Sequence, residues 1–207
     1  MDAKICGIKD FKTLQYILNH KYRPKYIGFI CNYPKSKRHV KLNNLKKLTN
    51  VNKKKTKFVG VLVKPNEKFL EKIKYFKFDY YQLYDVDPIK TKIIKKKYNK
   101  KIITALSIEN KNDVIKYKQY ISISDIILFD SKGYEKSMSF DKSWIKNLKI
   151  SKKKMIAGDI KYNDNLDKFV KITDIIDLSG SLETLDKKDL TKINKFLKNL
   201  KKINDKN

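Results

Sequence analysis

The sequence has few of the residues that build disulfide scaffolds and flexible linkers, and it has no long hydrophobic run. Its 207 residues include two cysteines, four prolines and six glycines. Two cysteines are too few for a disulfide framework, so a reduced, cytoplasmic compartment is expected. No apolar run approaches the roughly 18 residues of a membrane span. The first residues lack the apolar segment of a secretory signal, so neither a membrane anchor nor secretion is expected.

Arginine is scarce as well. The chain has 50 Lys and Arg residues against 22 Asp and Glu residues, a formal net charge of +28, yet Arg23 and Arg38 are its only arginines. Arginine is the side chain best suited to bidentate contacts with phosphates and bases. The lysines are spread along the whole chain, which favours a solvated surface over a specific nucleic-acid partner. A lysine-rich module that binds polyanions is the alternative, and the charge also predicts attraction of phosphorylated small molecules.

Apolar runs alternate with amphipathic stretches throughout. Hydrophobic residues make up 41% of the chain and aromatic residues 12%, too much for a disordered polycation. Eight apolar, β-branched runs predict strands at 3–6, 26–31, 58–63, 80–83, 101–106, 125–129, 154–157 and 174–178. Helical spacing of apolar residues follows these runs, with Asp10 as a helix cap, Pro65 and Pro88 opening helices, and further helices at 140–148 and 190–200.

This alternation predicts the fold class. Strands buried on both faces read as continuous apolar runs, and strands that alternate with helices form parallel sheets. Eight such units most simply close into a (β/α)8 TIM barrel, with a doubly wound open sheet as the structural alternative. A single α/β domain over residues 1–207 is expected, with residues 203–207 forming a frayed tail.

Polar residues gather where these strands end, and in a (β/α)8 barrel the active site lies at the C-terminal ends of the strands. Cys6 ends the first strand, Arg38 follows the second and Asp130 ends the sixth. Each has a structural explanation as a core thiol, a surface cation or a turn-forming aspartate. Together they provide a base, an arginine and an acid around one barrel mouth.

Two turns after the seventh and eighth strands add a second signal. Gly158-Asp159 and Ser179-Gly180-Ser181 lie where barrels of this kind bind phosphate, with a short helix expected at 182–184. The residues alone therefore predict a barrel enzyme that acts on a phosphorylated small molecule.

Several segments in the same order resemble the phosphoribosylanthranilate isomerase family of tryptophan biosynthesis, and the resemblance covers essentially the whole chain. They are Lys4-Ile5-Cys6-Gly7-Ile8, Ser36-Lys37-Arg38-His39-Val40, Gln82-Leu83, Leu128-Phe129-Asp130-Ser131, Ala157-Gly158 and Asp177-Leu178-Ser179-Gly180-Ser181-Leu182-Glu183. The resemblance implies an Amadori rearrangement of a phosphosugar without cofactor or metal. In it, N-(5'-phosphoribosyl)anthranilate becomes 1-(o-carboxyphenylamino)-1-deoxyribulose 5-phosphate.

The resemblance also implies a role for each site residue. Asp130 corresponds to the general acid that opens the sugar ring, and Cys6 to the general base that removes the proton from C2. Arg38 would hold the anthranilate carboxylate, and Gln82 and Asp177 would contact the substrate. The phosphate would be held around Gly158, Asp159, Ser179, Gly180 and Ser181. A cytoplasmic monomer is expected.

The chain departs from the family pattern at three places. The fourth strand continues Tyr84-Asp85 instead of His-Gly, the seventh ends Gly158-Asp159 instead of Gly-Gly, and the segment 133–139 lacks most glycines of the family loop. These departures bear on substrate affinity more than on reaction type. Three alternatives stay open: the histidine-pathway isomerase, which has an aspartate where Cys6 stands; indole-glycerol-phosphate synthase, whose Lys and Glu set is not found; and an inactive barrel that binds anions.

Overall fold

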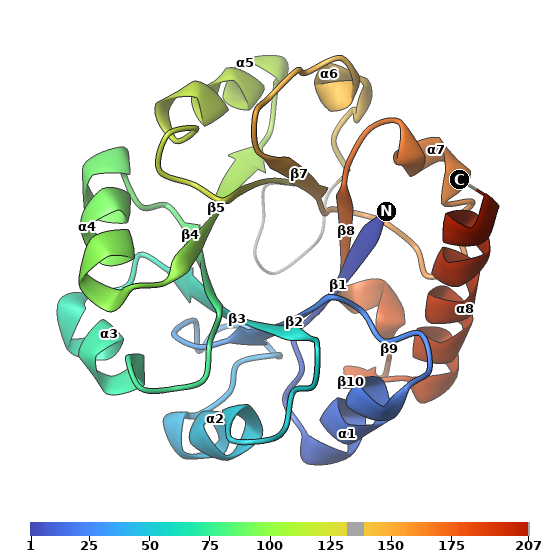
Figure 1. Ribbon diagram of the computed structural model, residues 1–207, viewed down its shortest axis with the longest axis horizontal. Helices are drawn as coiled ribbons and strands as arrows, with labels where there is room; N and C mark the ends of the chain where they lie inside the picture. The colour runs from blue at the N-terminus through green and yellow to red at the C-terminus, as the bar shows by residue number, and fades with distance from the viewer. Residues whose placement is uncertain (132–138, 207) are drawn as a thin grey trace.

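Parallel strands close into a barrel in which neighbours in sequence are neighbours in space (Figure 1). The computed structural model describes residues 1–131 and 139–206, so the expectations for the loop residues Gly133, Glu135 and Ser137 lie outside the described residues. The strands are β1 (Asp2–Cys6), β2 (Tyr26–Ile30), β3 (Lys57–Val63), β4 (Tyr80–Tyr84), β5 (Lys101–Ile108), β6 (Ile126–Ser131), β7 (Lys153–Ile156) and β8 (Ile175–Leu178). Strand β8 pairs in parallel with β1 and closes the barrel, which confirms the predicted (β/α)8 fold.

Helices surround the strands on the outside of the barrel (Figure 1). They are α1 (Phe11–Asn19), α2 (Leu42–Thr49), α3 (Glu67–Ile73), α4 (Pro88–Tyr98), α5 (Lys111–Val114) with the 3-10 turn η1 (Ile115–Gln119), α6 (Ser143–Lys146), α7 (Asp167–Val170) and α8 (Leu190–Lys206). Asp10 caps α1 as predicted, because its carboxylate accepts the N–H of Thr13 at 2.7 Å. Within the described residues, no helix is both long and apolar enough to cross a membrane.

Each strand has two buried faces, which explains the continuous apolar runs. Alternate side chains point into the barrel lumen, among them Val61, Ile103 and Leu128, and form one apolar cluster. The side chains between them, such as Phe29 and Ile127, pack in a larger cluster against the helices. Because the strand period is two residues, the same alternation sends polar residues near the strand ends into the barrel mouth.

Several predicted element ends are wrong. Helix α3 begins at Glu67 after the cap Asn66 instead of at Pro65. The predicted helix 140–148 is confined to Ser143–Lys146, because the Asp141 carboxylate accepts the N–H of Ser143 at 2.9 Å and holds the chain in a turn before it.

Two differences concern the last part of the chain. The short helix expected at 182–184 is instead the 3-10 turn η2 (Gly180–Leu182), which is followed by a hairpin of β9 (Glu183–Thr184) and β10 (Lys187–Lys188). Helix α8 continues through Lys206 where a frayed tail was expected, and the buried side chain of Ile203 explains this.

Candidate active site

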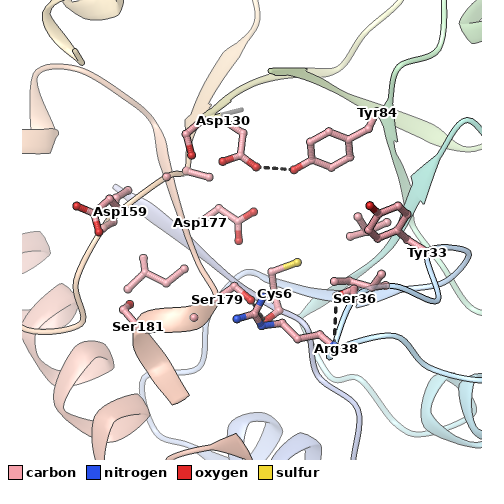
Figure 2. Close-up of a pocket in the computed structure, with 18 of the residues that line it drawn as sticks. Cys6, Tyr33, Ser36, Arg38, Tyr84, Asp130, Asp159, Asp177, Ser179 and Ser181 are labelled. Atoms are coloured by element: carbon pink, nitrogen blue, oxygen red, sulfur yellow. Dashed lines mark hydrogen bonds between the residues drawn. The ribbon is translucent and has the colours of Figure 1, made fainter. Parts of the chain in front are cut away.

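A cavity of about 440 Å³ opens at the C-terminal ends of the strands (Figure 2). A volume of this size suits a small organic ligand. Among the residues that line it are Cys6, Arg38, Asp130, Gly158, Asp159, Asp177, Ser179, Gly180 and Ser181. In Figure 2, Asp130 lies on one side of the cavity and Cys6 and Arg38 on the other, with Asp177 between them. The structure therefore brings together all of the predicted site residues except Gln82.

Cys6 ends β1 and faces the lumen beside Gly28 of β2. A Cβ atom on Gly28 would lie 2.8 Å from the Cys6 sulfur and 3.0 Å from the Lys4 side chain, so only glycine leaves room for both. Burial raises the pKa of the Cys6 thiol, and the ammonium group of Lys4 opposes that rise. The thiol therefore has a cation beside it that favours the thiolate.

Lys4 and Asp177 form an ion pair inside the barrel, below Cys6. They are partners in the register of β1 and β8, and their side chains meet at 2.5 Å with relative exposures of 0% and 6%. Burial disfavours the ammonium form of Lys4, but the Asp177 carboxylate outweighs it, so the pKa of Lys4 lies above its ordinary value. The second carboxylate oxygen of Asp177 is buried and has no hydrogen-bond partner among the described residues. It is therefore free to accept a hydrogen bond from a ligand hydroxyl in the cavity.

Asp130 on β6 is the second titratable group of the cavity. Its Oδ2 accepts a hydrogen bond of 2.6 Å from the hydroxyl of Tyr84, at the end of β4 (Figure 2). Burial raises the pKa of Asp130 to about 6, against the opposing effect of the Tyr84 hydrogen bond. A carboxyl group with this pKa can carry a proton near neutral pH and donate it, as a general acid must.

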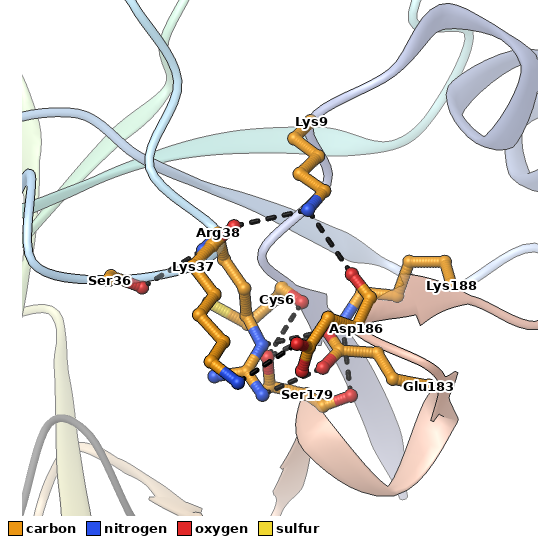
Figure 3. Close-up of polar contacts among 9 residues, drawn as sticks. All are labelled: Cys6, Lys9, Ser36, Lys37, Arg38, Ser179, Glu183, Asp186 and Lys188. Atoms are coloured by element: carbon orange, nitrogen blue, oxygen red, sulfur yellow. Dashed lines mark hydrogen bonds and ion pairs between the residues drawn. The ribbon is translucent and has the colours of Figure 1, made fainter.

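Arg38 comes from the loop after β2 and is held by the β9–β10 hairpin that follows β8, on the neighbouring side of the barrel mouth (Figure 3). Its Nε and Nη2 atoms each donate a hydrogen bond of 2.7 Å to the carboxylate of Glu183, which also accepts one from the buried ammonium group of Lys188 at 2.7 Å. The bonds from Arg38 occupy one edge of the guanidinium fork, and its five N–H donors leave the Nη1 side for a ligand. A planar carboxylate in the cavity is the group that such a fork binds best.

The turns after β7 and β8 form the third side of the cavity. Gly158 has a φ of +84°, and a Cβ there would lie 2.6 Å from the hydroxyl of Ser131. Asp159 is also left-handed, with a φ of 51°, and its carboxylate pairs with Lys161. The hydroxyl of Ser181 is buried in the cavity wall and has no hydrogen-bond partner among the described residues. These features are suited to an anion that accepts hydrogen bonds from a hydroxyl and from backbone N–H groups.

Sequence reasoning missed some of the residues that support the site. Gln82, predicted to contact substrate, is buried and does not line the cavity, and its amide donates to the Tyr84 hydroxyl at 3.1 Å. The partners Lys4, Glu183 and Lys188 lay inside or beside the quoted motifs, yet no role was predicted for them. For Lys4 there was one signal in the sequence, which was a lysine in the middle of an apolar strand.

The family model for N-(5'-phosphoribosyl)anthranilate (PRA) isomerase matches residues 3–199. The chain belongs to this isomerase family. The enzyme of that name from Agrobacterium fabrum is 30% identical over 207 residues, which cover 94% of this chain and 92% of the relative. The crystal structure of phosphoribosyl anthranilate isomerase from Thermotoga maritima superposes with a TM-score of 0.82 at 25% identity, covering 98% of this chain and 99% of that one. A PRA isomerase structure in complex with reduced 1-(o-carboxyphenylamino)-1-deoxyribulose 5-phosphate superposes with a TM-score of 0.80 at 24% identity, covering 98% and 99%.

Two of the positions at which this chain departs from the PRA isomerase family pattern share one backbone conformation. Asp85 and Asp159 replace glycines, and both are left-handed, with φ values of 52° and 51°. Aspartate tolerates this region better than most side chains. Each of these positions therefore keeps a backbone conformation that glycine adopts readily, while a carboxylate is added at each turn.

Proposed function

We propose that this chain isomerises N-(5'-phosphoribosyl)anthranilate to 1-(o-carboxyphenylamino)-1-deoxyribulose 5-phosphate with Asp130 as general acid and Cys6 as general base. The observation that carries the proposal is the presence of both groups in one cavity with the guanidinium of Arg38. Membership of the PRA isomerase family supports the same reaction.

The first step is opening of the furanose ring. Asp130 donates its proton to the ring oxygen while the bond from that oxygen to C1 breaks, and the anthranilate nitrogen supplies electrons to form a C1–N Schiff base. The raised pKa of Asp130, about 6, supports this role because a fraction of the group is protonated at neutral pH.

The second step is transfer of a proton from C2. The Cys6 thiolate removes it, the electrons of the C–H bond neutralise the cationic Schiff base, and an enolamine forms. The enolamine then loses its C2 hydroxyl proton and gains one at C1, which gives the ketone. The positive charge on the Schiff base and on Lys4 favours the thiolate at the moment it acts.

The two ends of the substrate would be held by Arg38 and by the turns after β7 and β8. The free edge of Arg38 binds the anthranilate carboxylate, the turns at Gly158-Asp159 and Ser179-Gly180-Ser181 bind the phosphate, and Asp177 accepts from a sugar hydroxyl. The relative bound to a reduced product analogue supports a ligand of this length in such a barrel. Holding both ends aligns C1 and C2 between the acid and the base.

A turnover assay on the purified protein tests the proposal. Phosphoribosylanthranilate is generated in situ, and its fluorescence is followed against the slow spontaneous decay. We expect enzyme-dependent loss of the signal. No loss above background would overturn the proposal, and the substrate of the histidine-pathway isomerase and DNA binding across a salt series would then be tested.

The pH dependence of kcat/KM should be bell-shaped, with its acid limb near pH 6. The pKa of Asp130 is about 6, whereas burial places that of Cys6 above its ordinary value. The productive form of the pair has a proton on Asp130 and none on Cys6. Between the two pKa values the dominant form has its proton on Cys6 instead, so both forms hold one proton in total. Activity therefore falls below pH 6, when the pair takes up a second proton, and again above the pKa of Cys6. An acid limb below pH 5 would contradict the assignment of Asp130.

Glu183→Gln should raise KM about ten-fold and leave kcat within about two-fold. Glu183 holds Arg38 in place, and a charge-assisted hydrogen bond contributes on the order of 1.5 kcal/mol. Arg38 binds a carboxylate that does not react. Misplacing Arg38 therefore weakens binding of the ground state and of the transition state equally. The matched control is Asp186→Asn in the same hairpin, which breaks an ion pair to Lys37 whose side chains are 72% and 59% exposed. Steady-state kinetics should find the control unchanged, and equal KM values in both variants would contradict the role of Glu183.

A cytoplasmic monomer is the accompanying proposal for assembly and location. The net charge of +28, carried by lysines spread along the whole chain, opposes the close approach of two copies. Light scattering on the purified protein should give the mass of one chain, and a mass of two chains would overturn the monomer.

A further inference from the structure

The hydroxyl of Tyr84 lies between two polar groups at the barrel mouth. It donates to Oδ2 of Asp130 at 2.6 Å and accepts from the amide of Gln82 at 3.1 Å. Tyr84 is the last residue of β4 and is 8% exposed, so its ring is held by the barrel wall. Figure 2 shows the ring reaching across the cavity mouth to the Asp130 carboxyl group. The contact therefore joins strands that are separated by β5 in the barrel.

We propose that Tyr84 is a positioning residue for the general acid: its hydroxyl binds one oxygen of Asp130 and thereby keeps the acidic proton on the other oxygen, toward the substrate. The inference rests on the role of Asp130 in the proposed function. Tyr84 stands where the family pattern has histidine, so the contact belongs to this chain's own version of the site.

The direction of the hydrogen bonds is fixed by chemistry. The Gln82 amide is a donor, so it occupies a lone pair of the Tyr84 oxygen and leaves the hydroxyl proton for Asp130. Burial and the nearby Asp130 hold the pKa of Tyr84 well above its ordinary value, so the hydroxyl stays protonated. A carboxylic acid accepts a hydrogen bond best at its carbonyl oxygen. The acidic proton of Asp130 is therefore kept on Oδ1.

The same contact favours the reaction as the proton leaves. Asp130 is neutral before it donates and becomes a carboxylate afterwards, and hydrogen bonds to charged acceptors are stronger than those to neutral ones. The Tyr84 hydroxyl thus binds the transition state for ring opening more tightly than the ground state. Its contribution should be found in kcat and hardly at all in KM.

Other charged groups also act on Asp130. Within the described residues they are Asp177 from β8, Lys4 from β1 and Lys142 from the segment before α6, and the backbone N–H of Ser131 is a further donor. Burial and Asp177 raise the pKa of Asp130, while the Tyr84 hydroxyl and Lys4 lower it. Removal of the hydroxyl alone leaves the other groups in place, so a change in the titration of Asp130 reports on Tyr84.

The test is Tyr84→Phe, which keeps the ring and removes the hydroxyl. We expect kcat to fall about 10- to 100-fold with KM within about two-fold. The acid limb of kcat/KM should move upward by about one pH unit, because Asp130 loses a donor that stabilises its carboxylate. The matched control is Tyr98→Phe, which removes a tyrosine–carboxylate hydrogen bond of 2.9 Å to Glu71 away from the cavity. The control should leave both kcat and the limb unchanged.

Incorporation of 3-fluorotyrosine at position 84 gives the opposite change. The fluorinated phenol is a stronger donor of nearly the same shape, so the acid limb should move downward. If both variants keep the wild-type limb and kcat while Asp130→Asn is inactive, the role of Tyr84 is wrong and that of Asp130 stands. Full activity of Asp130→Asn would instead overturn the proposed function. If Tyr84→Phe and the 3-fluorotyrosine variant lost kcat equally and neither shifted the acid limb, Tyr84 would have only a packing role.

Discussion

Replacing Cys6 with alanine is expected to lower kcat by about 10²–10⁴-fold, the usual contribution of a positioned general base. Cys6 lies at the end of β1 with the cation of Lys4 beside it, and no second thiol lines the cavity among the described residues. The substitution removes one sulfur atom from a wall that is already open to the cavity, so the barrel should keep its fold. KM should change little, because the thiol makes none of the contacts that hold the two ends of the substrate.

Cys31→Ala is the matched control for this prediction. Cys31 is the other buried cysteine, it lies just after β2, and its thiol donates to the carbonyl oxygen of Phe29 at 3.1 Å. Its loss should lower the melting temperature slightly and leave turnover unchanged. Steady-state turnover by Cys6→Ala within a few-fold of the wild-type value would mean that another group removes the C2 proton.

Asp130→Asn should also lower kcat by about 10²–10⁴-fold. The amide has the shape of the carboxyl group and can still accept the hydrogen bond from Tyr84, but it has no acidic proton to give to the ring oxygen. The loss should therefore be found in turnover, while circular dichroism and the melting temperature stay near the wild-type values. Asp85→Asn is the control, since Asp85 is an exposed carboxylate just beyond the Tyr84 end of β4. Wild-type turnover by Asp130→Asn would exclude Asp130 as the acid.

A substrate deuterated at C2 separates the two roles. In Cys6→Ala, cleavage of the C2–H bond limits the rate, so a large primary isotope effect on kcat is expected. In Asp130→Asn, ring opening limits the rate and the isotope effect should approach unity. The same isotope effect in both variants would contradict the division of labour between acid and base.

The strands could be predicted from sequence because burial on both faces leaves a direct mark. Runs such as 58–63 have no polar residue to interrupt them, and each of the eight barrel strands, β1 to β8, overlaps a predicted one, whereas the short β9–β10 hairpin was not predicted. The ends of helices were less predictable. The helix at 140–148 was expected from apolar spacing, but α6 begins only at Ser143, after a turn in which the Asp141 carboxylate accepts the N–H of Ser143. Such local competition with the backbone is not visible in a pattern of apolar residues.

The residues of the cavity wall were predictable, and their partners were not. Cys6 and Asp130 lie at the C-terminal ends of strands and Arg38 lies in the loop after one, so the barrel fold alone brings all three to the same end of the barrel. The contact of Arg38 with Glu183 joins residues 145 positions apart, and that of Tyr84 with Asp130 joins residues 46 apart. These contacts depend on how far side chains reach past the intervening strand, which strand assignment does not give. They also decide which edge of Arg38 and which oxygen of Asp130 are available to a ligand.

The ion pair between Lys4 and Asp177 has a consequence for the order of folding. It joins the first and last strands, 173 residues apart, and the Ser179 hydroxyl donates to the carbonyl oxygen of Cys6 across the same seam at 3.0 Å. Until β8 docks, Lys4 points into the barrel without a counter-ion, and a lone buried charge is strongly destabilising. Docking of β8 supplies the counter-ion of Lys4 and, through the contact of Ser179 with Cys6, also completes the wall of the site around Cys6.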